Sequence, residues 1–332
     1  MKKYEKEVMQ AHLDNEKEVL KKLETIYEDA IFEIDERLAV LLGRDDATLQ
    51  HVIYQADYQR ALKTQIKSIL EKLQANEFET VAEYLEYSYD EGFLGVMYSL
   101  QKQGIPLVIP ISQEQVIAAI QHETKLKSSL YTEMGKDISR LQKQIAGEIS
   151  RGISSASSYT EIAQNIARYS KIPMNRAMTI SRTESHRISE TASNHAQNRA
   201  KAKGARIKKI WDASLDADTR DSHMRVDGEI RELDEKFSNG LMYPGDPSGE
   251  PEEVINCRCR SRAEAEWALD VEETKSLGDV SEMTDKRKEE IAEKLGVSVH
   301  DLEGYSGQIV SLKPKNYQDF KKQYNKIAQK TK

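Results

Sequence analysis

The chain has 332 residues, of which 32% are charged and 38% hydrophobic, and its formal net charge at pH 7 is −7. The length allows two or more domains, the charged fraction favours elongated helices, and the negative charge argues against a general nucleic-acid coat. No apolar run approaches the roughly 20 residues of a membrane helix, and the amino terminus does not resemble a signal peptide. We therefore expect no membrane partner, synthesis in a cytoplasm, and cysteines that are initially reduced.

Helical periodicity dominates residues 1–108, which we predict to form an N-terminal helical region. Apolar residues recur every three or four positions over 20–38 and again over 58–73, which places each set on one face of a helix. A third helical segment should end at Gly104. The next stretch, GIPLVIP (104–110), has β-branched residues between two prolines, which predicts an extended connection.

Residues 109–172 are expected to hold a long helix and a shorter connecting helix. An apolar stripe over 130–149 repeats at steps of three and four and marks the long helix. The connecting helix should occupy 159–170, because Pro173 suits the first turn of a new helix. That new helix should run to about Gly204, where a glycine can end it.

The sequence changes character after residue 205. ARIKKIWDAS alternates apolar and polar residues around Trp211, which predicts a strand. Turn-rich sequence follows as far as INCRC (255–259), which contains both cysteines of the chain. The predicted fold class is α+β and predominantly α: an elongated helical N-terminal half, a small α+β module at 173–268, and a polar, lysine-rich tail at 269–332.

Three motifs follow one another within the module: SRTESHR on a helix, then WDASLDADTRDSHMRVDGE, then NCRC. In this order they resemble the phage head-morphogenesis family related to the phage Mu protein F, the minor head proteins of tailed double-stranded DNA phages. The resemblance covers about 173–268, less than a third of the chain. The residues that carry it are Arg182, Thr183, Glu184, Trp211, Asp216, Thr219, Arg220, His223, Gly228, Asn256, Cys257, Arg258 and Cys259.

This resemblance implies a protein without enzymatic activity that enters the phage head in a few copies during its assembly. It would be made in the cytoplasm of a bacterial host and lie inside the virion, in contact with the portal, with capsid or scaffolding proteins, and with double-stranded DNA. Release together with the genome is a further expectation. The alternatives are a metal-dependent nuclease or a toxin-like transferase built on the same module, or a scaffold without affinity for DNA.

Four residues of the motifs are candidate metal ligands: His223, Cys257, Cys259 and Asp216. Thiolate and imidazole are the ligands that zinc prefers, so a structural zinc ion is one interpretation. Many relatives carry Cys-x-x-Cys where this chain has residues 220–223, and a second His where it has EEVI. The other interpretation is a histidine that is hydrogen-bonded within its turn beside cysteines that are buried as small apolar residues. A disulfide between positions two apart would be strained.

The other motif residues are predicted to lock the module and not to catalyse a reaction. Arg182 and Glu184 lie two positions apart on a helix, so they should point to different sides and hold separate loops. The predicted locking residues are Arg182, Glu184, Trp211, Thr219, Arg220, Gly228, Asn256 and Arg258.

Two basic stretches could contact phosphate. Residues 196–210 contain six basic residues and no acid, and the last 22 residues contain seven lysines and one aspartate. The first stretch spans a helix end, where cations also interact favourably with the helix dipole. The second contains Tyr317, Phe320 and Tyr324 and resembles a flexible arm or a solvated tail. The candidate DNA-binding residues are Lys201, Lys203, Arg206, Lys208, Lys209, Lys321, Lys322, Lys326 and Lys330.

Overall fold

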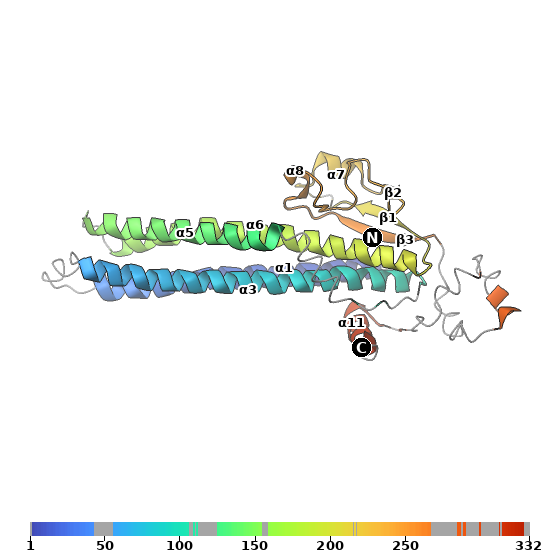
Figure 1. Ribbon diagram of the computed structural model, residues 1–332, viewed down its shortest axis with the longest axis horizontal. Coiled ribbons are helices and arrows are strands. Elements are labelled where there is room, and N and C mark those ends of the chain that lie inside the picture. Colours follow the sequence, from blue (N-terminus) through green and yellow to red (C-terminus); the bar gives the residue numbers. More distant parts are fainter. Residues whose placement is uncertain are drawn as a thin grey trace. The chain divides into compact units, whose positions relative to one another are not determined.

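The computed structural model (Figure 1) contains long helices and a small antiparallel sheet. This confirms the predicted class, α+β and predominantly α. The structure describes residues 2–42, 56–105, 125–154, 159–266 without 215 and 217, and 314–328, with isolated positions at 109, 111, 284–286, 288, 289, 299 and 312. Most of the predicted extended segment 104–110 and Lys330 lie outside the described residues.

The described helices and strands carry the labels of Figure 1. The helices are α1 (Lys3–Leu42), α3 (Ala56–Lys102), α5 (Lys125–Ser154), α6 (Tyr159–Ala202), α7 (Asp221–Arg225), α8 (Pro251–Val254) and α11 (Tyr317–Ala328). The strands are β1 (Ile207–Asp212), β2 (Ile230–Arg231) and β3 (Arg260–Ala265). Their order is β2-β1-β3, and β1 pairs antiparallel with both neighbours. The strand predicted around Trp211 is confirmed as β1.

The helix α6 passes through Pro173 without a break, so the predicted boundary between two helices at this proline is wrong. Ile162, Ile166, Ser170, Pro173 and Ala177 are all buried and follow one another at steps of four, four, three and four. This spacing keeps them on a single face of one helix. A proline inside a helix costs about 3 kcal/mol, and the burial of this continuous face offsets that cost. The packing therefore overrides the local preference.

A second expected boundary is also absent from this part of the chain. The helix over 58–73 and the segment ending at Gly104 were predicted separately, yet both lie in α3, which continues to Lys102. Residues 56–91 contain neither glycine nor proline, so nothing in the local sequence interrupts the helix.

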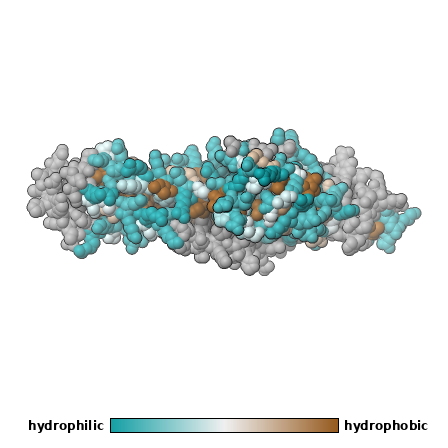
Figure 2. Space-filling model, turned by 90° about the horizontal axis from the view of Figure 1, so that it is seen from above, coloured by the Kyte–Doolittle hydropathy of each residue, from teal (hydrophilic) through white to brown (hydrophobic). Residues whose placement is uncertain are grey.

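The chain divides into two compact units, and the division falls within α1, α3 and α6. The second unit comprises Asn15–Tyr84 and Glu123–Arg182. Its core contains buried apolar residues from α1, α3, α5 and α6, among them Ile34, Ile66 and Ile145. All three predicted apolar stripes thus contribute to the core of one helical bundle. Figure 2 shows the outer surface of the molecule. Most of the coloured residues on the visible face are hydrophilic, and hydrophobic residues occur there as small spots.

The first unit comprises Met1–Asp14, Leu85–His122 and Thr183–Lys332, and it contains the sheet. Here α3 approaches α6 so closely that a Cβ atom on Gly92 would lie 2.1 Å from the carbonyl oxygen of Ser189. Glycine at position 92 allows this backbone contact. On the same helix, the carboxylate of Glu190 accepts a hydrogen bond of 2.8 Å from the Ser261 amide in β3. The sheet is therefore anchored on a rigid part of α6.

The C-terminal aromatic residues are part of a packed helix, so the expectation of a flexible arm is wrong for residues 317–328. Tyr317, Phe320 and Tyr324 are at most 2% exposed. The ring centroids of Tyr317 and Phe320 lie 5.3 Å from that of Tyr98 in α3. Spacings of three and four place these three aromatic residues on one helix face. The aromatic residues that suggested a flexible arm instead form the packing face of α11.

One acidic side chain lies in the interior of the second unit. Glu77 in α3 is 1% exposed. Burial raises the pKa of its carboxyl to about 8, while a hydrogen bond from the Tyr27 hydroxyl acts in the opposite direction and the nearby charge of Asp137 raises the pKa further. Asp137 itself pairs with Arg176 at 3.2 Å. Glu77 is therefore a buried carboxyl that the fold holds in its neutral form near neutral pH.

We predict that the free energy of unfolding falls as the pH rises from about 5 to about 8. The pKa of Glu77 is higher in the folded chain than the 4.5 of an exposed glutamate, so the folded state binds the extra proton in this range. The Glu77→Gln substitution should remove this slope and stabilise the protein at pH 8.5 by a few kcal/mol. Urea denaturation followed by circular dichroism at pH 6 and pH 8.5 measures both effects.

The matched control is Glu79→Gln, which makes the same charge change at an exposed position of the same helix. It should leave the pH dependence unchanged. An unaltered slope in the Glu77→Gln variant would contradict this account.

Candidate metal centre

The short helix α7 positions the histidine of the site. A closed turn precedes it: the Thr219 hydroxyl accepts a hydrogen bond from the Asp216 amide at 3.0 Å and donates one to the Asp216 carboxylate at 3.1 Å. Local bonding of this kind is typical of Asp and Thr in turns. The turn leads directly into α7, whose buried residue is His223. The local sequence DADTRDSH thus directs this one side chain into the module.

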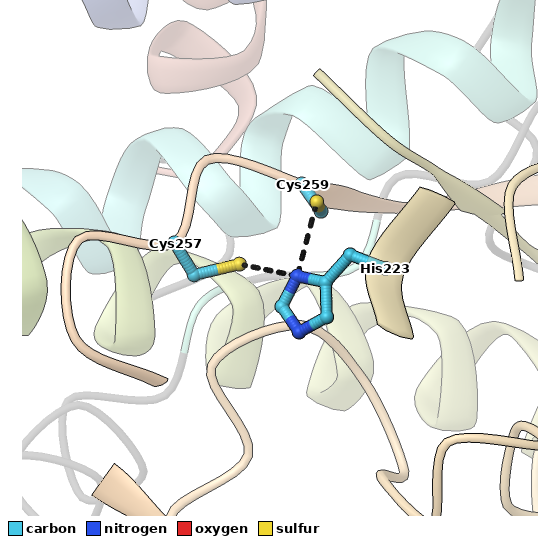
Figure 3. A group of neighbouring side chains, drawn as sticks. All are labelled: His223, Cys257 and Cys259. Atoms are coloured by element: carbon cyan, nitrogen blue, oxygen red, sulfur yellow. Dashed lines mark hydrogen bonds between the residues drawn. The ribbon is translucent and has the colours of Figure 1, made fainter. Parts of the chain in front are cut away.

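His223 and the two cysteines meet in the interior of the module (Figure 3). The imidazole Nδ1 lies 3.6 Å from the Sγ atom of Cys257 and 3.4 Å from that of Cys259. The three side chains are between 1% and 3% exposed. All three potential ligand atoms lie within 4.8 Å of one another. The structure therefore brings together three of the four predicted ligands, from segments more than 30 residues apart.

Asp216, the predicted fourth ligand, is not a member of this group among the described residues. Its carboxylate lies 2.9 Å from the Arg258 guanidinium and bonds the Thr219 hydroxyl. Arg258 also lies 3.4 Å from Asp218. These contacts tie the aspartate turn to the NCRC segment. Asp216 therefore contributes to the closure of the module, which is the role that was predicted for Arg258 and Thr219.

The other ring nitrogen of His223 faces a carboxylate. Its Nε2 lies 2.8 Å from Oε2 of Glu253 in α8, although the angle falls outside hydrogen-bond geometry. The Ser222 hydroxyl bonds both carboxylate oxygens of Glu253, at 3.1 and 2.9 Å. Sequence reasoning missed Glu253, because the segment EEVI was considered only as the replacement for a second histidine. Its position four residues before Cys257 was the signal that could have identified it.

The two thiols are electrostatically unequal. The hydrogen bond between them lowers the pKa of the Cys259 thiol. Burial raises this pKa, and the hydrogen bond with His223 lowers it further. The same hydrogen bond, together with burial, raises the pKa of Cys257. Cys257 therefore keeps its proton more firmly than Cys259 does, and Cys259 has thiolate character beside the imidazole. Both cysteines are free.

Trp211 closes the site on its apolar side. It is fully buried in a cluster with Val226, Phe237, Leu241 and the two cysteines. Its ring centroid lies 5.1 Å from that of His223, with the two rings nearly perpendicular. Such an edge-to-face arrangement is favourable for aromatic pairs. The predicted locking residue Trp211 thus forms the wall that separates the thiols from solvent.

Two further motif residues have backbone conformations that explain their identity. Gly228 has a φ of 73°, and its amide donates a hydrogen bond of 2.8 Å to the Trp211 carbonyl. Asn256 has a φ of 54°, and its amide donates one of 3.1 Å to the Thr183 hydroxyl in α6. Glycine and asparagine tolerate positive φ better than other residues. Thr183, between Arg182 and Glu184, therefore connects the NCRC segment to the long helix.

The remaining predicted locking residues hold different parts of the fold. Arg220 donates a hydrogen bond to the Ile255 carbonyl, which joins α7 to the NCRC segment. Arg182 pairs with Glu16 of α1 at 3.2 Å, and Glu184 pairs with Arg187 one turn along α6 at 2.8 Å. Arg182 and Glu184 thus have different partners, as predicted, but these ion pairs are with helical residues and not with loops. Burial raises the pKa of Glu184 to about 7.

Several basic candidates for DNA contact are paired within the protein. Lys209 is 1% exposed, and its ammonium group donates hydrogen bonds to the carbonyls of Leu233 and Met242 at 3.2 and 2.8 Å. It is therefore unavailable to phosphate in this structure. Lys208 lies 2.9 Å from Glu266, and Lys201 lies 3.7 Å from Asp234. The first basic stretch thus carries less free positive charge than its sequence indicates.

Comparison with known proteins agrees with this architecture. Residues 143–262 match the family described as phage Mu protein F like protein. This match confirms the predicted resemblance to the Mu F family over these residues. The match covers α6, the sheet and the NCRC segment, and it begins before the predicted module start at 173. We refer to residues 143–262 as the Mu F-like module.

Two curated relatives match parts of the chain. The NAD(+)–arginine ADP-ribosyltransferase EFV of Enterococcus faecalis is 26% identical over 260 residues, which are 77% of this chain and 53% of that protein. The minor head protein GP7 of Bacillus phage SPP1 is 31% identical over 122 residues, which are 36% of this chain and 39% of that protein. The matches thus span about half of the first relative and less of the second. No solved structure matches. None of the described helices is long and apolar enough to cross a membrane.

We predict that Asn256→Ala destabilises the Mu F-like module by about 1 kcal/mol, because alanine disfavours the left-handed conformation at this position. Asn256→Gly should stay within about 0.5 kcal/mol of the wild type, because glycine accepts the same φ. Both variants keep the amide that bonds Thr183, so their difference isolates the backbone conformation. Urea denaturation measures it. Equal stability of the two variants would show that the positive φ does not select asparagine.

Proposed function

We propose that this chain is a minor head protein of a tailed double-stranded DNA phage. In this proposal it enters the head in a few copies during assembly and lies inside the virion, in contact with the portal and with capsid or scaffolding proteins. The observation that carries the proposal is the match of residues 143–262 to the Mu F-like family, and 122 residues of the chain also match the minor head protein GP7 of phage SPP1.

The burial of the histidine–cysteine cluster supports a role without catalytic turnover. A catalytic group has to reach its substrate, whereas His223, Cys257 and Cys259 are nearly inaccessible. Trp211 covers the cluster from within the apolar core. The locking contacts of Arg220 and Arg258 hold the two segments of the site together. Such a unit is suited to resist unfolding and not to bind and release a substrate.

Composition of the virion tests this proposal. Particles of the phage that encodes this chain should contain it at a few copies per head after density-gradient purification, as counted by quantitative mass spectrometry. A tagged chain co-expressed with that phage's portal protein should retain the portal on an affinity column, and the portal protein expressed without the tagged chain provides the control. Loss of the chain from heads that have ejected their DNA would support release with the genome. Absence from purified heads would overturn the proposal.

Contact with packaged DNA is part of the proposal, and particular lysines are the candidates for this contact. In α11 the aromatic residues are buried, and Lys321 lies 2.6 Å from Glu91. Lys322 and Lys326 are exposed on the same helix. Both could meet phosphate without disturbing the packed face of the helix. The exposed lysines of α11 are therefore better candidates than Lys321 or the buried Lys209.

We predict that Lys322→Gln with Lys326→Gln lowers the salt dependence of DNA binding. Each phosphate contact that is lost should reduce the slope of log K against log salt by about 1. Fluorescence anisotropy with a short duplex at several salt concentrations measures the slope. The control removes the same charge from exposed positions of α3, Lys63→Gln with Lys72→Gln. A slope that is unchanged in the first variant, or equally reduced in both, would remove α11 from the DNA interface.

One observation favours a second candidate, a toxin-like transferase. The Enterococcus relative, which matches 77% of this chain, is named an ADP-ribosyltransferase. Consumption of NAD+ by the purified chain distinguishes the two candidates, because a structural head component does not consume it. The variant His223→Ala adds a second comparison: activity that disappeared with this substitution would place the reaction at the cluster.

A further inference from the structure

The histidine–cysteine cluster has the geometry of a metal site. In a tetrahedral zinc site, bond lengths of about 2.0–2.1 Å to nitrogen and about 2.3 Å to sulfur place nitrogen and sulfur ~3.6 Å apart. The Nδ1 atom of His223 lies 3.6 Å from one sulfur and 3.4 Å from the other. The two nitrogen–sulfur separations are thus those of ligands to one ion, and the locking contacts hold the two segments in place.

A single hydrogen bond at Nδ1 does not account for the approach of both sulfurs to this nitrogen. A neutral imidazole nitrogen has one lone pair or one proton, so Nδ1 can make one good bond to a thiol. Both sulfurs nevertheless approach this same nitrogen (Figure 3). A cation placed between the three atoms satisfies all of them at once.

Glu253 provides an independent indication. Histidines that bind metals usually direct their other nitrogen to a carboxylate or carbonyl, which fixes the tautomer and the ring orientation. Here Nε2 lies 2.8 Å from Glu253, and Ser222 holds that carboxylate by bonds to both of its oxygens. The Glu253 carboxylate therefore lies where such a partner of a metal-binding histidine is found, although its angle to Nε2 falls outside hydrogen-bond geometry.

We propose that His223, Cys257 and Cys259 bind one zinc ion that stabilises the Mu F-like module. Two thiolates and one imidazole favour zinc over calcium or magnesium, which prefer oxygen ligands. The described residues offer no fourth side-chain donor in this group, so the fourth position belongs to a non-protein ligand such as water. The inference does not depend on the role in the phage head, because it rests on the geometry of this chain alone.

The wild-type protein tests the proposal without any substitution. Protein expressed in zinc-supplemented medium and desalted into metal-free buffer should contain about one zinc per chain by mass spectrometry of metals. After removal of zinc under reducing conditions, titration with cobalt(II) should produce thiolate-to-cobalt charge-transfer bands and the intense visible bands of a tetrahedral site, with an end point at one equivalent. Chelation should lower the thermal midpoint, and added zinc should restore it.

Variants then assign the ligands. Cys257→Ser, Cys259→Ser and His223→Ala should each abolish stoichiometric binding. Glu253→Gln should retain the cobalt spectrum but weaken affinity about 10- to 100-fold, as expected for a residue that orients a ligand. Asp216→Asn should leave the metal content unchanged, because this carboxylate pairs with Arg258 and Thr219. Circular dichroism checks that each variant is folded.

Two results would overturn the proposal. One is wild-type protein with far less than one metal per chain after growth in zinc and no cobalt bands when fully reduced. The other is a negative thiol titration of the denatured protein, which would mean that Cys257 and Cys259 form a disulfide. A change in metal content caused by Asp216→Asn alone would overturn the ligand assignment. None of these results bears on whether the chain is found in virions, so the two proposals fail separately.

Discussion

The meeting of His223 with the two thiols is the contact on which the small module depends. The sheet has three strands, one of them only two residues long, and much of the surrounding sequence is turn. A unit of this kind buries little apolar surface, so it needs further constraints to hold its segments together. The cluster connects α7 with the NCRC segment at the point where Trp211 and Phe237 form the apolar core. Removal of this contact would leave two loops joined mainly by surface ion pairs, which contribute little individually.

The NCRC segment and β3 are also fixed to the long helix α6 of the same module. The Thr183 hydroxyl receives the Asn256 amide, and the Glu190 carboxylate receives the Ser261 amide two turns further along. Glu190 is fully buried, and burial raises its pKa to about 7. A buried carboxyl that accepts a backbone hydrogen bond is costly to leave unpaired. These two bonds therefore define the register of the NCRC segment and β3 against the helix.

The sequence predicted those features that repeat and those that are local. Helical periodicity identified the buried faces of the bundle, and alternation identified β1. The prediction from sequence failed where packing decided the outcome. Pro173 lies inside a helix whose buried face continues on both sides of it. The aromatic residues of α11 contact Tyr98, which is more than 200 residues away in the sequence. No window of local sequence contains that partner.

The predicted site succeeded and failed for similar reasons. The three soft ligands were recognisable as residue types in an ordered motif, whereas Asp216 was assigned to them by chemistry alone, and its actual partners are Arg258 and Thr219. Glu253 was overlooked because its position near Cys257 in the sequence does not show that it faces the imidazole of His223. Residue type therefore indicated which chemistry was available, and only the three-dimensional arrangement decided which groups share it.

Membership in a family does not by itself fix an activity, since function resides in sites carried by folds. The two curated relatives carry names of different classes, one an enzyme and one a head protein, yet both match this chain. The properties of the module itself are therefore more informative than either name. Its potentially reactive groups are buried. Its turn residues Gly228 and Asn256 allow a positive φ, and Arg258 pairs with the adjacent aspartates. Each of these arrangements closes the site. A module that is closed in this way holds its outer surface in a fixed arrangement on α6. A component that must be placed correctly in an assembly needs such a surface.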